Sequence, residues 1–175
     1  MYDMKIYLIG FMGSGKSTVG KLLSGKLGYN FIDLDEYIEK ETGRTIFDLF
    51  DQGGEDKFRM LEHEHLKKLL AKDDVVIALG GGTPCFYNNM SILNKGGISI
   101  YLEIGVTTLV KRLSKDKKKR PLIRDLTEAE LKLFIEEELK KRLIIYRKAH
   151  HIVNAEMESA KEMANEIAIF LKKEN

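Results

Sequence analysis

The stretch GFMGSGKST, residues 10–18, decides the fold class of this 175-residue chain. It fits the pattern GxxxxGK[ST] and lies between a strand-like run at residues 5–9 and a helical pattern at residues 16–27, the context that a phosphate-binding loop requires. Its glycines allow close backbone approach, so that successive N–H groups face one concavity, and the helix adds its positive N-terminal end. We therefore predict that ATP or GTP binds here.

Two side chains of this motif have predicted roles in phosphate chemistry. The ammonium group of Lys16 reaches the β- and γ-phosphates, and the hydroxyl of Ser17 ligates Mg²⁺. The alternative, a glycine-rich turn without a ligand, is disfavoured by the strand–loop–helix context.

The composition is that of a single compact domain covering residues 1–175. Hydrophobic residues make up 43% and charged residues 32%, and the net charge of +2 means that an anion must be met by local placement of cations. The single cysteine, Cys85, excludes a disulfide framework and a cysteine-rich zinc cluster. The apolar runs are too short to span a bilayer, and no basic-then-apolar leader is visible, so we expect a cytoplasmic protein without a membrane partner.

Strand-like and helical patterns alternate from end to end, without an internal repeat. This alternation predicts an α/β fold in which helices cover both faces of a parallel sheet, with ligands at the carboxyl ends of the strands. Helices beginning after Thr127 and Ser159 are indicated by capping boxes with Glu130 and Glu162. The expected strands are 5–9, 30–32, 75–79, 98–102 and 151–153, and the other expected helices are 16–27, 35–42, 46–51, 55–71 and 106–113.

Two aspartates, Asp33 and Asp35, follow the second predicted strand as the sequence DLD. Strand alternation would place both on one side of the chain, beside the phosphate loop. One carboxylate can hold Mg²⁺ through water, and the other can orient and activate a substrate hydroxyl. The alternative is that they cap the next helix, as Asp35 in particular could.

A glycine turn and two arginines complete the set of candidates from the residues alone. Gly80-Gly81-Gly82 directly follows the predicted strand 75–79 and lets a ligand approach the backbone, although a turn without a ligand is the common case for glycines. Arg142 falls within the apolar stripe of its helix, where it needs either a structural carboxylate or an anionic substrate, and Arg59 resembles it. If the two arginines converge, their planar guanidinium groups suit a carboxylate.

A strongly basic segment, residues 111–120, has seven basic residues in ten and ends at Arg120. Such a run is commonly a solvated face or a nucleic-acid patch, but no aromatic residue is interleaved for base stacking. It could instead fold over the nucleotide as a lid, from which Arg120 would stabilise charge on the transferred phosphoryl group.

Taken in order, six motifs of this chain resemble the shikimate kinase family over residues 5 to about 153. They are GFMGSGKST, Asp33-Leu34-Asp35, Gly54-Glu55 with Phe58-Arg59, Gly80-Gly81-Gly82, Arg120-Pro121-Leu122, and Arg142 with Tyr146-Arg147. The resemblance implies a nucleoside-monophosphate-kinase-like P-loop fold of three layers with a central five-stranded parallel sheet, a lid at about 112–125 and a substrate-binding helical segment at about 35–62. It also implies ATP-dependent phosphorylation of the 3-hydroxyl of shikimate, in chorismate and aromatic amino-acid biosynthesis, by a monomer.

Residue by residue, the resemblance implies the following site. Asp35, a possible general base, binds the shikimate hydroxyls, while Arg59, Gly81 and Arg142 hold its carboxylate. Mg²⁺ has Ser17 as ligand and Asp33 in its outer shell. The expected ATP-binding residues are Gly13, Ser14, Gly15, Lys16, Ser17, Thr18, Arg112 beside the adenine, and Arg120 from the lid.

Two departures from the family pattern affect the ATP side. Residues 115–119 lack the glycine or threonine that is common in these lids, and residues 154–156 match the adenine-side segment poorly.

Three other classes of function share some of these features. A signalling GTPase would need a guanine-reading NKxD, whereas Asn94-Lys95 is followed by two glycines. A gluconate kinase on the same scaffold would share the arginine pair, because gluconate also carries a carboxylate. A nucleic-acid module built on the basic segment would bind oligonucleotides in a salt-sensitive way, which suits a near-neutral chain poorly, and we expect no nucleic-acid partner.

Overall fold

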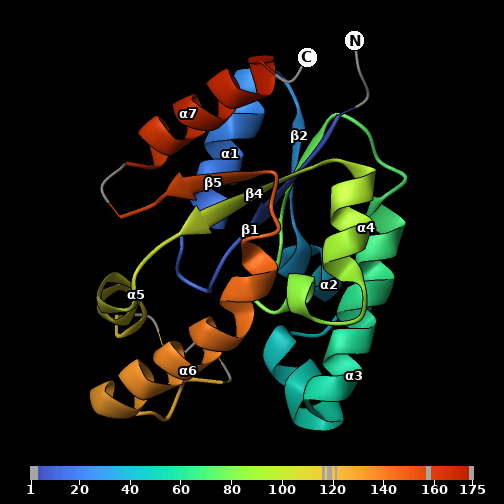
Figure 1. Cartoon of the computed structure of the whole chain (residues 1–175). Coiled ribbons are helices and arrows are strands. Elements are labelled where there is room, and N and C mark those ends of the chain that lie inside the picture. Colours follow the sequence, from blue (N-terminus) through green and yellow to red (C-terminus); the bar gives the residue numbers. More distant parts are fainter. Residues whose placement is uncertain (1–3, 116, 118–119, 121, 157–158, 174–175) are drawn as a thin grey trace.

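The protein is described by a computed structural model that covers residues 4–115, 117, 120, 122–156 and 159–173. Five parallel strands form one sheet in the order β2-β3-β1-β4-β5 (Figure 1). The strands are β1 Lys5–Ile9, β2 Asn30–Asp33, β3 Val75–Ala78, β4 Ile98–Glu103 and β5 His151–Asn154. The helices are α1 Lys16–Leu27, α2 Leu34–Thr42, α3 Ile46–Leu69, α4 Asn89–Gly96, α5 Val106–Leu113, α6 Glu128–Tyr146 and α7 Ala160–Lys173, and a 3₁₀ turn, η1, covers Thr83–Cys85.

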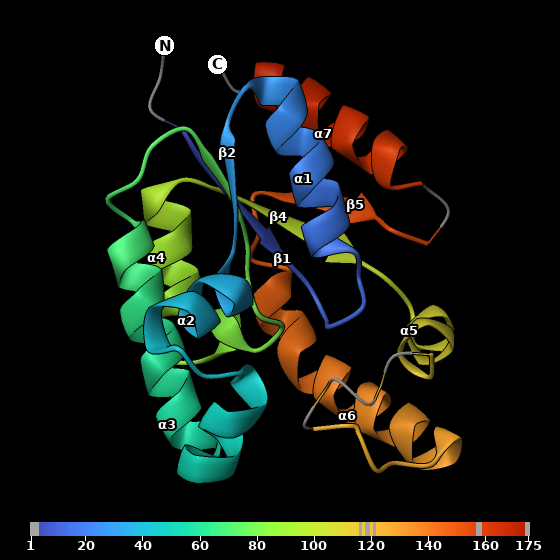
Figure 2. The same cartoon turned by 180° about the vertical axis from the view of Figure 1, so that it is seen from behind.

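Helices cover both faces of the sheet, which confirms the three-layer prediction. Successive side chains of β1 point to opposite faces, as strand geometry requires. Ile6 and Leu8 join the core cluster formed with α1 and α7, whereas Tyr7 and Ile9 join the cluster formed with α2, α3 and α4. Figure 2 shows α1 and α7 together on one side, and α2, α3 and α4 on the other.

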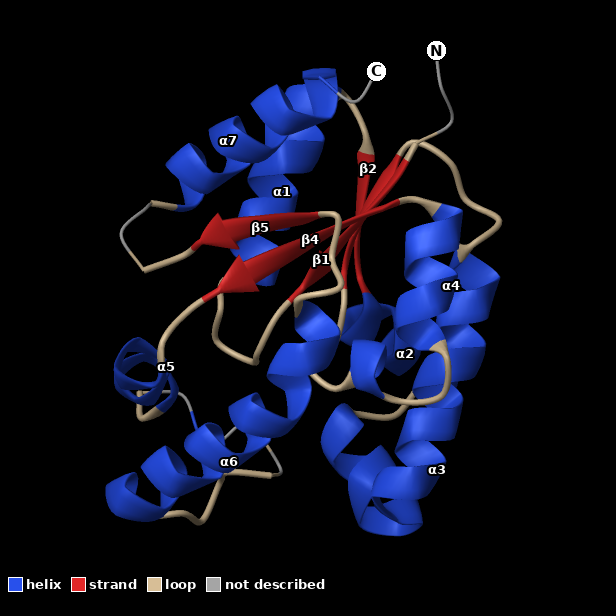
Figure 3. Ribbon diagram, in the orientation of Figure 1, coloured by secondary structure: helices blue, strands red, loops and turns tan. Residues whose placement is uncertain are grey.

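The part of the molecule beyond the carboxyl ends of the strands is built by α5, α6 and the first half of α3 (Figure 3). The capping boxes expected at Thr127 and Ser159 are both present, and Thr127 begins α6 by accepting from the Glu130 amide. Among the described residues, no helix combines the length and apolarity needed to cross a bilayer.

The structure differs from the predicted elements in two places. The expected helices 46–51 and 55–71 appear as one element, α3, broken by a non-helical backbone at Gly54 with φ 70° and ψ 178°. The positive φ suits glycine and lets the chain change direction between the two halves. The turn η1 and helix α4 were not predicted, because their residues lack a clear apolar period.

Candidate active site

The phosphate loop joins β1 to α1 at the carboxyl edge of the sheet. Gly13 and Gly15 adopt φ of 82° and 97°, a region that glycine occupies without steric cost, and Gly15 is the N-cap of α1. The buried ammonium group of Lys16 donates to the carbonyls of Gly10 and Phe11, at 2.9 Å each. The side chain therefore lies folded over the concavity of the loop, as the motif predicts.

At the start of α1, Ser17 meets the end of β2. Its hydroxyl donates to Asp33 Oδ2 at 2.5 Å, so the expected magnesium ligand contacts the residue expected in the outer shell of the ion. The other oxygen of Asp33 accepts from the Asp35 amide at 3.1 Å. Asp33 is therefore both the last residue of β2 and the N-cap of α2.

The predicted placement of the aspartate pair was thus wrong in one respect. Asp35 lies in the first turn of α2, as the predicted helix 35–42 requires, and so strand alternation does not place it; Asp33, not Asp35, caps the helix. The helix turns Asp35 toward the phosphate loop, where strand alternation was expected to bring it. Both aspartates line one cavity of about 300 Å³ together with the phosphate loop.

Asp35 has an unusual electrostatic environment. Its Oδ1 is buried and has no hydrogen-bond partner among the described residues. Burial, with Glu62 and Asp33 nearby, raises the pKa of Asp35 from 3.8 to about 7, against the opposing influence of Lys16 and Arg59. Burial also lowers the pKa of Lys16 to about 8, while Asp35 acts in the opposite direction. A carboxyl with a pKa near neutrality is suited to accept a proton at physiological pH.

The glycine turn after β3 is confined on three sides. A Cβ on Gly80 would meet the Glu62 carboxylate, and one on Gly82 would lie 2.5 Å from Arg59 Cζ. A Cβ on Gly81 would lie 3.1 Å from the Met12 amide of the phosphate loop. The turn is therefore packed between α3 and the phosphate loop, and side chains at these three positions would crowd their neighbours.

Arg59 is held by two carboxylates and several rings. Its guanidinium binds Glu62 at 2.8 Å and Glu55 at 3.0 Å, and lies 4.7 Å from the ring centre of Phe86. Glu62 is itself almost completely buried, and it also accepts from the hydroxyl of Thr83. The orientation of Arg59 is consequently set by charged groups on its own helix and by the turn that follows the glycines.

Arg142, on α6, is buried as its place in the apolar stripe predicts. It binds Glu138 at 2.5 Å and lies 5.2 Å from the ring centre of Phe11. Each of the two arginines thus binds a structural carboxylate, and both also line a common space. A structural carboxylate and an anionic substrate are therefore not exclusive partners.

That common space is a second cavity, of about 360 Å³. Its charged lining consists of Asp35, Glu36, Glu39, Arg59, Glu62, Arg120 and Arg142, and its apolar lining of Met12, Ile46, Phe47, Phe50, Phe58 and Leu122. Asp35, Arg120, Met12, Gly80 and Gly81 also line the cavity at the phosphate loop. The two cavities therefore share a wall, where a phosphate and a hydroxyl can meet.

The basic segment contributes one arginine to this shared wall and another to the nucleotide side. Arg120 lines both cavities, and its Nε is buried without a hydrogen-bond partner among the described residues. Arg112, on α5, donates to the Gly13 carbonyl at 3.2 Å, which places it beside the phosphate loop. Residues 116, 118–119 and Pro121 of the expected lid lie outside the described residues.

All expected site residues outside the lid reach this edge of the sheet, but several neighbours were missed. Glu62 and Met12 line the cavities, while Thr83 and Glu138 bind the lining residues Glu62 and Arg142. Glu62 and Glu138 carry a weak sequence signal, since each lies three or four positions from a buried arginine on a helix.

Comparison with known proteins agrees with this geometry. The family model described as shikimate kinase matches residues 12–172. A shikimate kinase of Phocaeicola vulgatus is 41% identical over 98% of both chains. The shikimate kinase structure from Bacteroides thetaiotaomicron superposes with a TM-score of 0.91 at 38% identity, covering 97% of this chain and 98% of that one. The Acinetobacter baumannii enzyme in complex with shikimate gives 0.90 at 36% identity, covering 98% and 94%.

Proposed function

The chain belongs to the shikimate kinase family, and from this premise we propose which of its residues carry each part of the reaction. It phosphorylates the 3-hydroxyl of shikimate at the expense of ATP, giving shikimate 3-phosphate and ADP for chorismate and aromatic amino-acid biosynthesis. The observation that carries the assignment of residues is the wall shared by the two cavities, which contains Asp35 and Arg120.

ATP occupies the cavity at the phosphate loop. The backbone of residues 13–18, which include Ser14 and Thr18, surrounds its phosphates. Lys16 exchanges its two carbonyl acceptors for phosphate oxygens, which stabilises negative charge developing on the transferred group. Arg120 adds a second cation from the opposite side, and Arg112 lies along the adenine.

Ser17 and Asp33 are the residues that would hold magnesium. The oxygen pair is already in contact at 2.5 Å, and one hydroxyl with one carboxylate is a typical protein contribution to an ion that otherwise keeps water and phosphate oxygens. Ser17 would ligate the ion directly and Asp33 through water. When bound, the ion neutralises charge on the phosphates.

Shikimate occupies the cavity beside α3 and α6. Its carboxylate is held by Arg59, Arg142 and the amide of Gly81, and its ring lies against the apolar wall that includes Phe47 and Phe58. Carboxylates bind well to planar guanidinium groups because two parallel hydrogen bonds form.

Asp35 orients the reacting hydroxyl and accepts its proton. As the shikimate oxygen bonds to the γ-phosphorus, the bond to the ADP oxygen breaks, and the hydroxyl proton moves to the Asp35 carboxylate. The raised pKa of Asp35, about 7, makes this transfer favourable near neutral pH.

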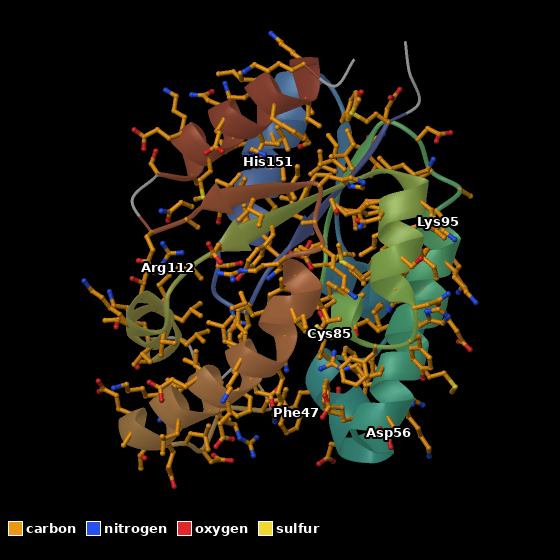
Figure 4. The ribbon with its side chains drawn as sticks, viewed as in Figure 1. Phe47, Asp56, Cys85, Lys95, Arg112 and His151 are labelled. Carbon is orange, nitrogen blue, oxygen red and sulfur yellow. The ribbon has the colours of Figure 1, made fainter. Side chains whose placement is uncertain are left out.

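The chain acts as one domain, with residues 35–62 as the substrate-binding segment and residues 112–125 as a lid. From described residues, the lid role is supported by Arg120 and Leu122 in the cavity wall and by Arg124, whose guanidinium lies 4.9 Å from the ring centre of Phe47. Figure 4 shows Phe47 at the start of α3, facing α6. We further propose a cytoplasmic monomer.

The test is ADP release with Mg·ATP and, in parallel, shikimate, gluconate or AMP. We expect turnover with shikimate alone, and comparable kcat/KM for gluconate would contradict the assignment of the acid site. Lys16→Ala should reduce kcat by a factor of about 10² or more through lost charge stabilisation. Lys26→Ala, which removes an exposed lysine from the same helix, is the matched control and should keep wild-type turnover.

A further inference from the structure

We propose that Tyr146 is a positioning residue of the acid site: its phenol holds the Gly81–Gly82 peptide and the Arg142 guanidinium in the arrangement that receives the substrate carboxylate. The inference rests on the proposed roles of Gly81 and Arg142 and goes beyond them, since Tyr146 itself does not line the cavity.

The phenol lies completely buried at the end of α6, directly behind the glycine turn. Its hydroxyl donates to the Gly81 carbonyl, 65 positions away in the chain. Among the described residues no other donor reaches this carbonyl. The hydroxyl is therefore the contact that ties the turn after β3 to α6.

This hydrogen bond sets the direction of a neighbouring amide as well. In a planar trans peptide the carbonyl and the following N–H point in opposite directions, so fixing the Gly81 carbonyl aims the Gly82 N–H away from Tyr146. Within the described part of the chain, the amides of Gly81 and Gly82 have no acceptor, and both residues line the acid cavity. Two donors are thus left available to an anion.

The same phenol adjoins the arginine of the site. Arg142 and Tyr146 are four positions apart on α6 and therefore lie on one face of the helix. Burial raises the pKa of the Tyr146 phenol above its usual value, and the nearby positive charge of Arg142 acts against this rise. The Tyr146 phenol therefore binds the glycine turn and lies beside Arg142, and both of these are proposed to bind the substrate carboxylate.

The glycine turn has little room to move if the hydrogen bond from Tyr146 is lost. Gly82 is packed on Arg59 and Gly81 on the phosphate loop, so a rotation of the turn would alter the arginine and both subsites together. Packing alone does not explain the hydroxyl, because phenylalanine would retain the tilted ring contact of Tyr146 with Tyr101, whose ring centres are 5.1 Å apart.

The first experiment measures steady-state kinetics of Tyr146→Phe with shikimate and ATP. Removing the donor leaves a buried carbonyl unpaired, and we expect KM for shikimate to rise about tenfold, with KM for ATP changed by less than about twofold. Tyr101→Phe removes the hydroxyl of the other ring of this pair, which makes no hydrogen bond to the turn among the described residues, and should leave both constants unchanged. Melting temperatures of both variants report any general loss of stability.

The second experiment compares binding of shikimate with binding of its methyl ester, which lacks the carboxylate charge. The ratio of the two affinities should fall about tenfold in Tyr146→Phe, because only the charged ligand uses the positioned groups. A lower melting temperature with an unchanged ratio would mean a structural role and overturn the inference. If Arg142→Lys also leaves this ratio unchanged, the assignment of Arg142 itself fails. If Arg142→Lys lowers the ratio while Tyr146→Phe does not, only the positioning role is lost.

Discussion

Arg59 and Glu62 form an ion pair in which both side chains are almost fully buried, with 6% and 1% of their surface exposed and 2.8 Å between Nη1 and Oε2. A buried pair of this kind is costly to break from one side, because an uncompensated charge remains. Glu62 also accepts from Thr83 and raises the pKa of Asp35. One carboxylate thus connects the orientation of an arginine with the proton affinity of the proposed base.

Glu62→Gln should therefore have two separable effects. The loss of a charge-assisted hydrogen bond to Arg59 should raise KM for shikimate about tenfold. Removal of the negative charge should also lower the pKa of Asp35, so that the acidic limb of the kcat/KM profile moves to lower pH. A pH series of initial rates measures both, and an unshifted limb would separate Glu62 from the titration of Asp35.

Asp35→Asn should lower activity and raise stability. Loss of the proton acceptor should reduce kcat by a factor of about 10². Because the folded-state pKa of Asp35 is raised from 3.8 to about 7, wild-type stability falls as pH rises through this window. The variant lacks that penalty, so its free energy of unfolding should exceed that of wild type by up to about 4 kcal/mol at pH 8, since a change of one in pKa corresponds to about 1.4 kcal/mol, and by little near pH 4.

Urea denaturation at the two pH values measures this difference. An equal offset at pH 4 and pH 8 would contradict the titration, and a stabilised but fully active variant would contradict the catalytic role.

The pH dependence of wild type should be bell-shaped. kcat/KM for ATP should fall below about pH 7, as Asp35 becomes protonated, and above about pH 8, as Lys16 loses its proton. Bound phosphates favour the charged ammonium, so the basic limb of kcat should lie at higher pH than that of kcat/KM. Coincident basic limbs would argue against contact between Lys16 and the nucleotide.

Gly82→Ala should impair shikimate binding more than ATP binding. The added Cβ would lie 2.5 Å from Arg59 Cζ, so the guanidinium must move. We expect KM for shikimate to rise at least about tenfold, corresponding to about 1.4 kcal/mol. Gly25→Ala, in α1, is the matched control, because nothing lies within 4 Å of the Cβ that it adds. This variant should stabilise the protein by about 0.5–1 kcal/mol, with unchanged kinetics.

Arg124→Ala and Phe47→Ala should weaken closure over the acid cavity. Their contact joins the segment after Arg120 to the start of α3, and exposed pairs of this type contribute about 0.5–1 kcal/mol. Each variant should raise KM for shikimate about two- to fivefold with little change in kcat, and the double variant should add nothing further. Additive effects in this cycle would show that the two side chains act independently.

Much of the molecule follows from the sequence alone. Regular patterns predicted all five strands and most helices, since an apolar run or a capping box is a local signal that burial then reinforces. The phosphate loop was identified from its glycines and Lys16, because its function uses the backbone of consecutive residues. Buried Arg142 was likewise apparent from its place in an apolar stripe.

The tertiary structure decided how distant charges act on one another. That Asp33 bonds to Ser17, that Glu62 raises the pKa of Asp35, and that Tyr146 donates to the Gly81 carbonyl depend on side chains brought together across elements. Burial and hydrogen bonding act over a few ångströms in space, whatever the separation along the chain. The local pattern therefore determines which elements form, and only their packing determines which groups share a site and a proton.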